Sequence, residues 1–277
     1  NGDSAINPLN SEFKDEASSF WGGIVDGNDV TRGGTAEQFG KNRSLYTDIG
    51  GNNLISTENK VQDSNASITA ELLGGVTPLR RTTILDWAEG YDVSDPAYDP
   101  ADASSLTSTP ARKDLGDPLH SQPTVLQYNS PSATTRIYVG TNHGYLHSFD
   151  ADDGEEKWAY IPQELLSQLD TVVENPNGSK IYGLDGSAAI HLIDGNNNGA
   201  VDSGDRALLY IGQRRGGKNY YAVDITNPDS PELLFKIEGG TGDFDKLGQS
   251  WSTPTIAKMN LSGVNSDKLV MIFGGGW

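Results

Sequence analysis

The 277-residue sequence contains no cysteine and only two methionines. Without cysteine the chain forms neither disulfides nor zinc–thiolate sites, and it has no thiol nucleophile. It also lacks any apolar run near the roughly 20 residues that a membrane-spanning helix requires. The absence of cysteine is compatible with an envelope or extracellular protein but does not establish that location. Thiol and disulfide chemistry are therefore excluded.

Basic residues are scarce relative to acidic ones. The chain has 20 lysines and arginines against 38 aspartates and glutamates, which gives a formal net charge of -18 at pH 7. A surface of this charge repels phosphate backbones and attracts divalent cations. We therefore expect no nucleic acid among the partners of this protein.

Glycine is abundant, with 33 residues, and it gathers with Asn and Asp between apolar runs. Those runs are rich in aromatic and β-branched residues, which favour strands over helices. From residue 113 onward a repeat is visible, with anchors at Pro123-Thr-Val, Ala188-Ala-Ile and Pro254-Thr-Ile that are 65 and 66 residues apart. Each anchor precedes a second apolar run that ends in glycine, and the first two units continue with a third and a fourth run.

Four strands in each repeating unit are typical of a β-propeller blade. The sequence therefore predicts an all-β fold, with an incomplete β-propeller over residues 113–277 that contains about three recognisable four-stranded blades. A helix at 162–169 and a loop at 194–205 are predicted as insertions into this frame.

Residues 1–112 have less regular patterns. We predict that they form an irregular N-terminal part of the propeller domain, or a lead-in to it, with a short strand at 20–25 and a short helix at 82–89. The sequence begins without Met and stops where a strand pattern meets a turn. We therefore expect it to be a piece of a longer chain.

The strongest chemical signal is the segment DGNNNGAVDSGD at residues 194–205. Oxygen-bearing side chains at loop positions 1, 3, 5, 9 and 12, glycine at position 6 and a main-chain carbonyl at position 7 match an EF-hand-type calcium loop. The predicted Ca²⁺ ligands are Asp194, Asn196, Asn198, Asp202 and Asp205, with the carbonyl oxygen of Ala200. The flanking residues have strand patterns, and the alternative is an ordinary Asn/Gly hairpin turn.

One other motif suggests a chemistry that its surroundings do not support. The segment GQRRGGKN at 212–219 is close to a phosphate-binding loop, but it lacks the Ser or Thr that holds magnesium and leads into a strand rather than a helix. We interpret it as a glycine-rich hairpin.

The sequence also lacks a recognisable catalytic arrangement. The four histidines form no metal pair at helical spacing, and no Ser-His-Asp or paired-carboxylate arrangement is evident, so we predict that the protein is not an enzyme.

Several runs occur in the order found in one known family. LGDPLHSQP at 115–123, YVGTNHGYLHSFD at 138–150, GQRRGGKNYYAVDITNP at 212–228 and FGGGW at 273–277 resemble the propeller domain of PilY/PilC-type type IV pilus proteins. The resemblance implies an extracellular or cell-surface protein, at the pilus tip or outer membrane, with roles in pilus assembly, retraction and adhesion. The partners it implies are pilin or minor pilins at the tip, host or surface ligands, and the remainder of a longer chain.

The resemblance also bears on the calcium loop. Related pilus proteins carry a loop of this kind in the propeller, which implies a ligand role for Asp194, Asn196, Asn198, Ala200 and Asp202, whereas Asp205 is supported by the EF-hand spacing alone.

Two alternative functions stay open. The segment ending in Gly154-Glu-Glu-Lys-Trp158 resembles the blades of pyrroloquinoline quinone dehydrogenases, which suggests a quinoprotein oxidoreductase, and a generic outer-membrane scaffold has the same architecture. We favour blade packing for Trp158 and Trp251.

Overall fold

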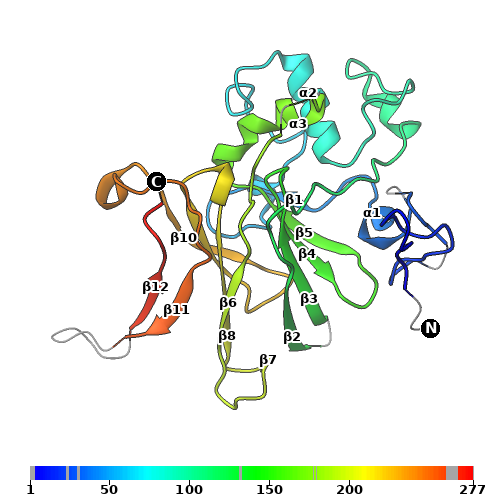
Figure 1. The fold of residues 1–277 in the computed structure, drawn as a ribbon. Coiled ribbons are helices and arrows are strands. Elements are labelled where there is room, and N and C mark those ends of the chain that lie inside the picture. The colour runs from blue at the N-terminus through cyan, green and yellow to red at the C-terminus, as the bar shows by residue number, and fades with distance from the viewer. Residues whose placement is uncertain are drawn as a thin grey trace.

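Two propeller blades, each of four antiparallel strands, form the centre of the computed structural model, which describes residues 4–22, 25–29, 32–130, 133–176, 178, 180–259 and 268–276 (Figure 1). The second blade is a sheet of its own, whereas one parallel strand at each edge extends the first blade to a six-stranded sheet. The first blade consists of β2 (Thr124–Ser130), β3 (Ala133–Gly140), β4 (Leu146–Asp150) and β5 (Glu156–Tyr160), and the second of β6 (Ala189–Ile193), β8 (Arg206–Gly212), β9 (Tyr220–Asp224) and β10 (Glu232–Ile237). In both blades the strands pair in chain order. β11 (Thr255–Lys258) and β12 (Leu269–Ile272) form a third antiparallel unit with two strands in the described part of the chain. The predicted partial propeller is confirmed.

The blades pack face to face, so their middle strands are covered on both sides. Four of the five residues of β4 and of β9 are buried, as are six of the seven residues of β8. Between the blades the rings of Tyr160 in β5 and Tyr221 in β9 pack at a centroid distance of 6.3 Å, and both side chains are fully buried. Burial on both faces explains why β8 and β9 read as nearly continuous apolar runs, whereas β4 also buries His147 and Ser148.

The N-terminal part lies along the outer strands of both blades. β1 (Leu45–Tyr46) pairs in parallel with β5. A few residues later the amide of Leu54 donates to the carbonyl of Pro231, and the amide of Leu233 in β10 donates to the carbonyl of Asn52. One stretch of chain thus crosses the open edges of two sheets, where unpaired backbone groups would otherwise face solvent or another chain.

Helices cover one end of the sheets (Figure 1). The helix predicted at 82–89 is confirmed but begins earlier, as α2 (Pro78–Ala88), because Thr77 Oγ1 caps it by accepting a 3.2 Å hydrogen bond from the amide of Arg80. α2 contacts α3 (Leu169–Glu174). α3 directly follows the 3-10 helix η3 (Gln163–Gln168), so the helix predicted at 162–169 is also confirmed.

The remaining short elements are α1 (Gly34–Gln38), η1 (Thr57–Asn59), η2 (Ala103–Thr107), η4 (Arg214–Gly216), η5 (Gly242–Phe244) and β7 (Ala200–Val201). The strand predicted at 20–25 was wrong for residues 20–22 and 25, which form no strand, while Gly23 and Ile24 lie outside the described residues. The interpretation of residues 212–219 as a hairpin rather than a phosphate-binding loop is confirmed, since η4 leads into strand β9, which pairs with β8.

Candidate calcium-binding loop

The loop at 194–205 connects β6 to β8 and reaches the neighbouring blade. Within it β7 pairs in parallel with β2 of the first blade, in the register Gln127 with Ala200 and Tyr128 with Val201. Ala200 and Val201 are buried. Sequence patterns predicted a loop that ties together two strands of one blade, but the structure shows that it also joins two blades.

The first half of the loop is folded around Asp194. Its Oδ1 accepts hydrogen bonds from the amides of Asn196 (3.0 Å) and Asn197 (2.5 Å), and its Oδ2 accepts from the amide of Gly199 (2.8 Å). Gly199 has φ +80°, which gives the sharp turn required at position 6. These hydrogen bonds, that of Gly199 first, lower the pKa of Asp194, which keeps the carboxylate charged.

The second cluster of predicted ligands centres on Asp202. Its Oδ2 accepts from the side-chain amides of Asn196 (2.9 Å) and Asn198 (2.8 Å), so three predicted ligands meet at one point. Hydrogen bonding by Asn196 and then by Asn198 lowers the pKa of Asp202, and Asn129 of β2 adds to this effect. Sequence reasoning missed Asn129, because spacing within a loop carries no information about a strand of another blade.

Asp205 closes the base of the loop and is only 6% exposed. Its Oδ1 accepts from the amide of Gly195 (2.9 Å), and its Oδ2 accepts from the amide of Asp202 (3.1 Å). In this arrangement both carboxylate oxygens bind the main chain.

The donor set has the oxygen chemistry that calcium takes, but its side chains are not arranged around one metal position. Among the described residues no group of three or more His, Cys, Asp or Glu side chains is placed to hold a metal ion. The side-chain amides of Asn196 and Asn198 point their nitrogens, not their oxygens, at Asp202. Since calcium takes oxygen ligands, a half-turn of each carboxamide about χ2 would present Oδ1 instead.

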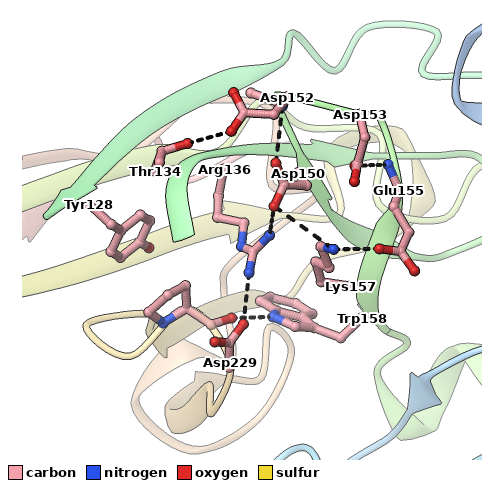
Figure 2. Close-up of polar contacts among 12 residues, drawn as sticks. Tyr128, Thr134, Arg136, Asp150, Asp152, Asp153, Glu155, Lys157, Trp158 and Asp229 are labelled. Atoms are coloured by element: carbon pink, nitrogen blue, oxygen red, sulfur yellow. Dashed lines mark hydrogen bonds and ion pairs between the residues drawn. The ribbon is translucent and has the colours of Figure 1, made fainter. Parts of the chain in front are cut away.

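A buried arginine links the same two blades (Figure 2). Arg136 of β3 is 1% exposed, and its Nη1 and Nη2 lie 2.7 Å from Asp150 Oδ2 and Asp229 Oδ1, respectively. Asp150 ends β4 of the first blade, whereas Asp229 lies in the turn between β9 and β10 of the second. The guanidinium therefore carries an ion pair across the junction.

The same turn of the second blade receives two further hydrogen bonds from the first. Trp158 Nε1 donates to the carbonyl of Pro228 at 2.8 Å, and Tyr128 Oη donates to the carbonyl of Ile225 at 2.8 Å (Figure 2 shows both rings). Trp158 is 2% exposed. This placement agrees with the role in blade packing predicted for Trp158. Because Tyr128 belongs to β2, which also pairs with β7, the contacts between the blades extend to the strand beside the candidate calcium loop.

A Thr–His–Glu row that sequence reasoning missed lies inside the first blade. Thr141 Oγ1 is 3.2 Å from His147 Nε2, and His147 Nδ1 is 2.7 Å from Glu156 Oε1. Arg43 also binds Glu156, with hydrogen bonds of 2.7 and 2.8 Å. The order resembles a nucleophile, base and acid, but all of these side chains are buried, which bars a substrate. The row holds β4 and β5 to the N-terminal part.

A model of the PilY1 beta-propeller domain matches residues 117–272, which is more than half of the chain. The chain belongs to the PilY1 β-propeller family. The resemblance seen in the sequence is thereby confirmed, and it associates the chain with type IV pilus biogenesis. In the described residues no helix is long and apolar enough to cross a membrane.

Individual relatives give the same family. The chain is 28% identical over 170 residues to the type IV pilus biogenesis factor PilY1 of Pseudomonas aeruginosa strain UCBPP-PA14, covering 53% of this chain and 14% of that protein. It is 33% identical over 123 residues to a PilY1 homolog of Xylella fastidiosa, covering 44% and 9%. A crystal structure of the Pseudomonas aeruginosa PilY1 C-terminal domain aligns with 30% identity and a TM-score of 0.36, over 53% of this chain and 25% of that one. The chain thus spans only a small part of the curated relatives it matches.

Proposed function

We propose that this chain is the calcium-binding β-propeller module of an extracellular type IV pilus biogenesis and adhesion protein, and that it has no catalytic activity. Membership of the PilY1 propeller family supports the pilus role. The same membership supports a location at the pilus tip or outer membrane. The partners we propose are pilin or minor pilins, host or surface ligands, and the remainder of a longer chain.

The calcium role is carried by one observation, the convergence of Asn196 and Asn198 on Asp202 in a loop already turned around Asp194. A calcium ion would replace the two amide–carboxylate hydrogen bonds with oxygen coordination. The carbonyl of Ala200 would complete the set from β7. Since β7 pairs with β2, calcium bound there would stabilise the contact between blades as well as the loop.

The affinity should be modest. Position 12 is Asp205, whose side chain is one methylene shorter than the usual bidentate Glu, and no helices flank the loop. We expect a dissociation constant on the order of 10⁻⁶ to 10⁻³ M, the range of sensors and extracellular modules. Calcium outside cells would then keep the loop occupied.

The buried contacts of the blade argue against the oxidoreductase alternative. Trp158 has its indole N–H bound to a carbonyl of the next blade and its ring against Tyr138, so neither is free to sandwich a quinone. His147, the residue best placed as a base, is 1% exposed. Both observations favour a binding module.

Labelling of the intact parent protein on cells tests the pilus role. We expect the label at pilus tips or at the outer membrane near them, and fewer surface pili when Asp194→Ala and Asp202→Ala are combined. Asp245→Ala is the matched control, because Asp245 is exposed and, among the described residues, its ion pair is with the exposed Lys246 alone. Labelling unrelated to pili, or equal loss of pili in the control, would refute the proposal.

A further inference from the structure

A cavity of about 370 Å³ lies at the end of β6 opposite the calcium loop. Its walls come from the segments that precede β2, β6 and β11, the first strands of three successive blades, and from the turn between β8 and β9. The side chains that matter for its chemistry are those of His120, Gln122, Ser187, Arg214, Trp251 and Thr253. None of them belongs to the proposed calcium site.

The repeat brings three of the functional side chains of this region together. His120, Asp185 and Trp251 each lie three residues before a blade anchor, at 123, 188 and 254. They therefore occupy one structural position in three consecutive blades. Contacts between these segments include a 3.0 Å hydrogen bond from the amide of Gln122 to Ser187 Oγ.

Asp185 holds the His120 and Arg214 side chains of the cavity lining in place. Its side chain is fully buried, with both carboxylate oxygens 3.0 Å from His120 Nδ1 and Oδ2 3.1 Å from Arg214 Nη1. The side chains of His120 and Arg214 are 43% and 26% exposed. The carboxylate thus orients both groups through one nitrogen of each, and among the described residues their other ring and guanidinium nitrogens stay available to a ligand in the cavity.

The backbone is strained at this cavity. In the described part of the chain the non-glycine residues with positive φ are Ser11, Asn42, Leu119, Asn175, Asn197 and Arg214. Asn tolerates the left-handed region, but Leu and Arg do so rarely. Leu119, at φ +27°, and Arg214, at φ +51°, both line this cavity. Strain retained at two walls of one cavity is typical of a functional site.

The charge and shape of the lining indicate the ligand. Among the described residues that line the cavity there are a guanidinium and an imidazole but no carboxylate, and the buried Asp185 carboxylate binds one nitrogen of each from outside the lining. Gln122, Ser187 and Thr253 add polar groups. The Trp251 ring lies 5.0 Å from the Arg214 guanidinium, and in the described part of the chain its buried Nε1 has no hydrogen-bond partner.

We propose that this cavity binds an acidic sugar, with the carboxylate of one hexuronic acid unit against Arg214 and its hydroxyls against the polar walls. Arginine binds carboxylates in preference to neutral groups, and its planar fork allows two parallel hydrogen bonds. Among the described residues of the lining Leu119 is the only aliphatic side chain, so they form no aliphatic subsite for peptide side chains. A volume near 370 Å³ suits a monosaccharide unit.

Calorimetric titration of the full chain with glucuronate tests this proposal, with glucose and N-acetyl-Ala-Ala as comparison ligands. We expect glucuronate to bind, glucose to bind much more weakly, and Arg214→Ala to weaken glucuronate binding about tenfold or more. Arg215→Ala is the matched control, because Arg215 contacts Tyr182 and lies outside the cavity lining. It should leave glucuronate binding unchanged.

Melting curves show whether each variant is folded, and His120→Gln provides a second test if Arg214→Ala is not. Failure of the folded wild-type chain to bind glucuronate would overturn the proposal. So would equal binding of glucose, equal or tighter binding of the dipeptide, which indicates a peptide carboxylate site, or equal weakening by Arg215→Ala. Because the cavity and the calcium loop lie at opposite ends of β6, calcium binding can fail or succeed independently of this result.

Discussion

Replacement of Arg136 by methionine removes the ion pair across the blade junction while it keeps most of the apolar stem. Arg136 is 1% exposed, and the side chains of its partners Asp150 and Asp229 are 13% and 44% exposed. Loss of one member of a buried pair costs about 3–5 kcal/mol, whereas an exposed pair contributes about 0–1 kcal/mol. Since both carboxylates can recover some hydration, we expect a loss of about 3 kcal/mol.

A loss of about 3 kcal/mol lowers the melting temperature by roughly 6–12 °C at the 2–4 °C per kcal/mol typical of chains near this size. Urea unfolding and calorimetric melts of Arg136→Met measure it. Arg206→Met is the matched control, because Arg206 is 53% exposed and pairs with Asp224 within one blade, and it should cost below about 1 kcal/mol. If the two variants lose the same stability, the junction pair is not the contact described here.

Three further predictions concern stability and cofactor binding. Burial, with the nearby charge of Arg112, lowers the pKa of His143 to about 3 in the folded chain. In the unfolded chain the pKa of this histidine is about 6.5, so the unfolded chain takes up the imidazole proton first as the pH falls. Stability should therefore be complete above pH 6.5 and decline by on the order of 4 kcal/mol toward pH 3, and a flat profile of urea midpoints would contradict this. Gly216→Ala should cost about 1–3 kcal/mol, because its Cβ would collide with the carbonyl of Gly183, whereas Gly40→Ala, with open space, should be nearly neutral in the same melts. Equilibrium dialysis should show no micromolar retention of pyrroloquinoline quinone, and retention would restore the oxidoreductase alternative.

The blades could be predicted from the sequence because their signals are local. Each strand is a short apolar run bounded by turn residues, and the anchors recur at a nearly constant spacing. The candidate calcium loop was visible for the same reason, since its oxygen side chains lie within twelve consecutive residues. Its folded turn around Asp194 matches the expected loop geometry, whereas occupancy by calcium stays a prediction.

The contacts that the sequence did not reveal join segments far apart in the chain. The pairing of β1 with β5 involves Leu45, in a stretch whose two-residue strand is too short for a pattern. Likewise, the sequence around β7 and around Arg136 does not indicate which residues of the other blade they contact. Such contacts depend on how the blades stack, and strand periodicity fixes which face of a strand is buried but not what covers it.

Calorimetric titration with calcium tests the central claim most directly. The wild-type chain should bind one calcium ion with a dissociation constant on the order of 10⁻⁶ to 10⁻³ M and should melt at a higher temperature in calcium than in chelator. Asp194→Ala and Asp202→Ala should abolish both effects, whereas Asp245→Ala should keep them. Magnesium should substitute poorly, because it requires tighter octahedral geometry. No calcium uptake at millimolar concentration, or unchanged binding by the Asp194 and Asp202 variants, would show that residues 194–205 form only a turn.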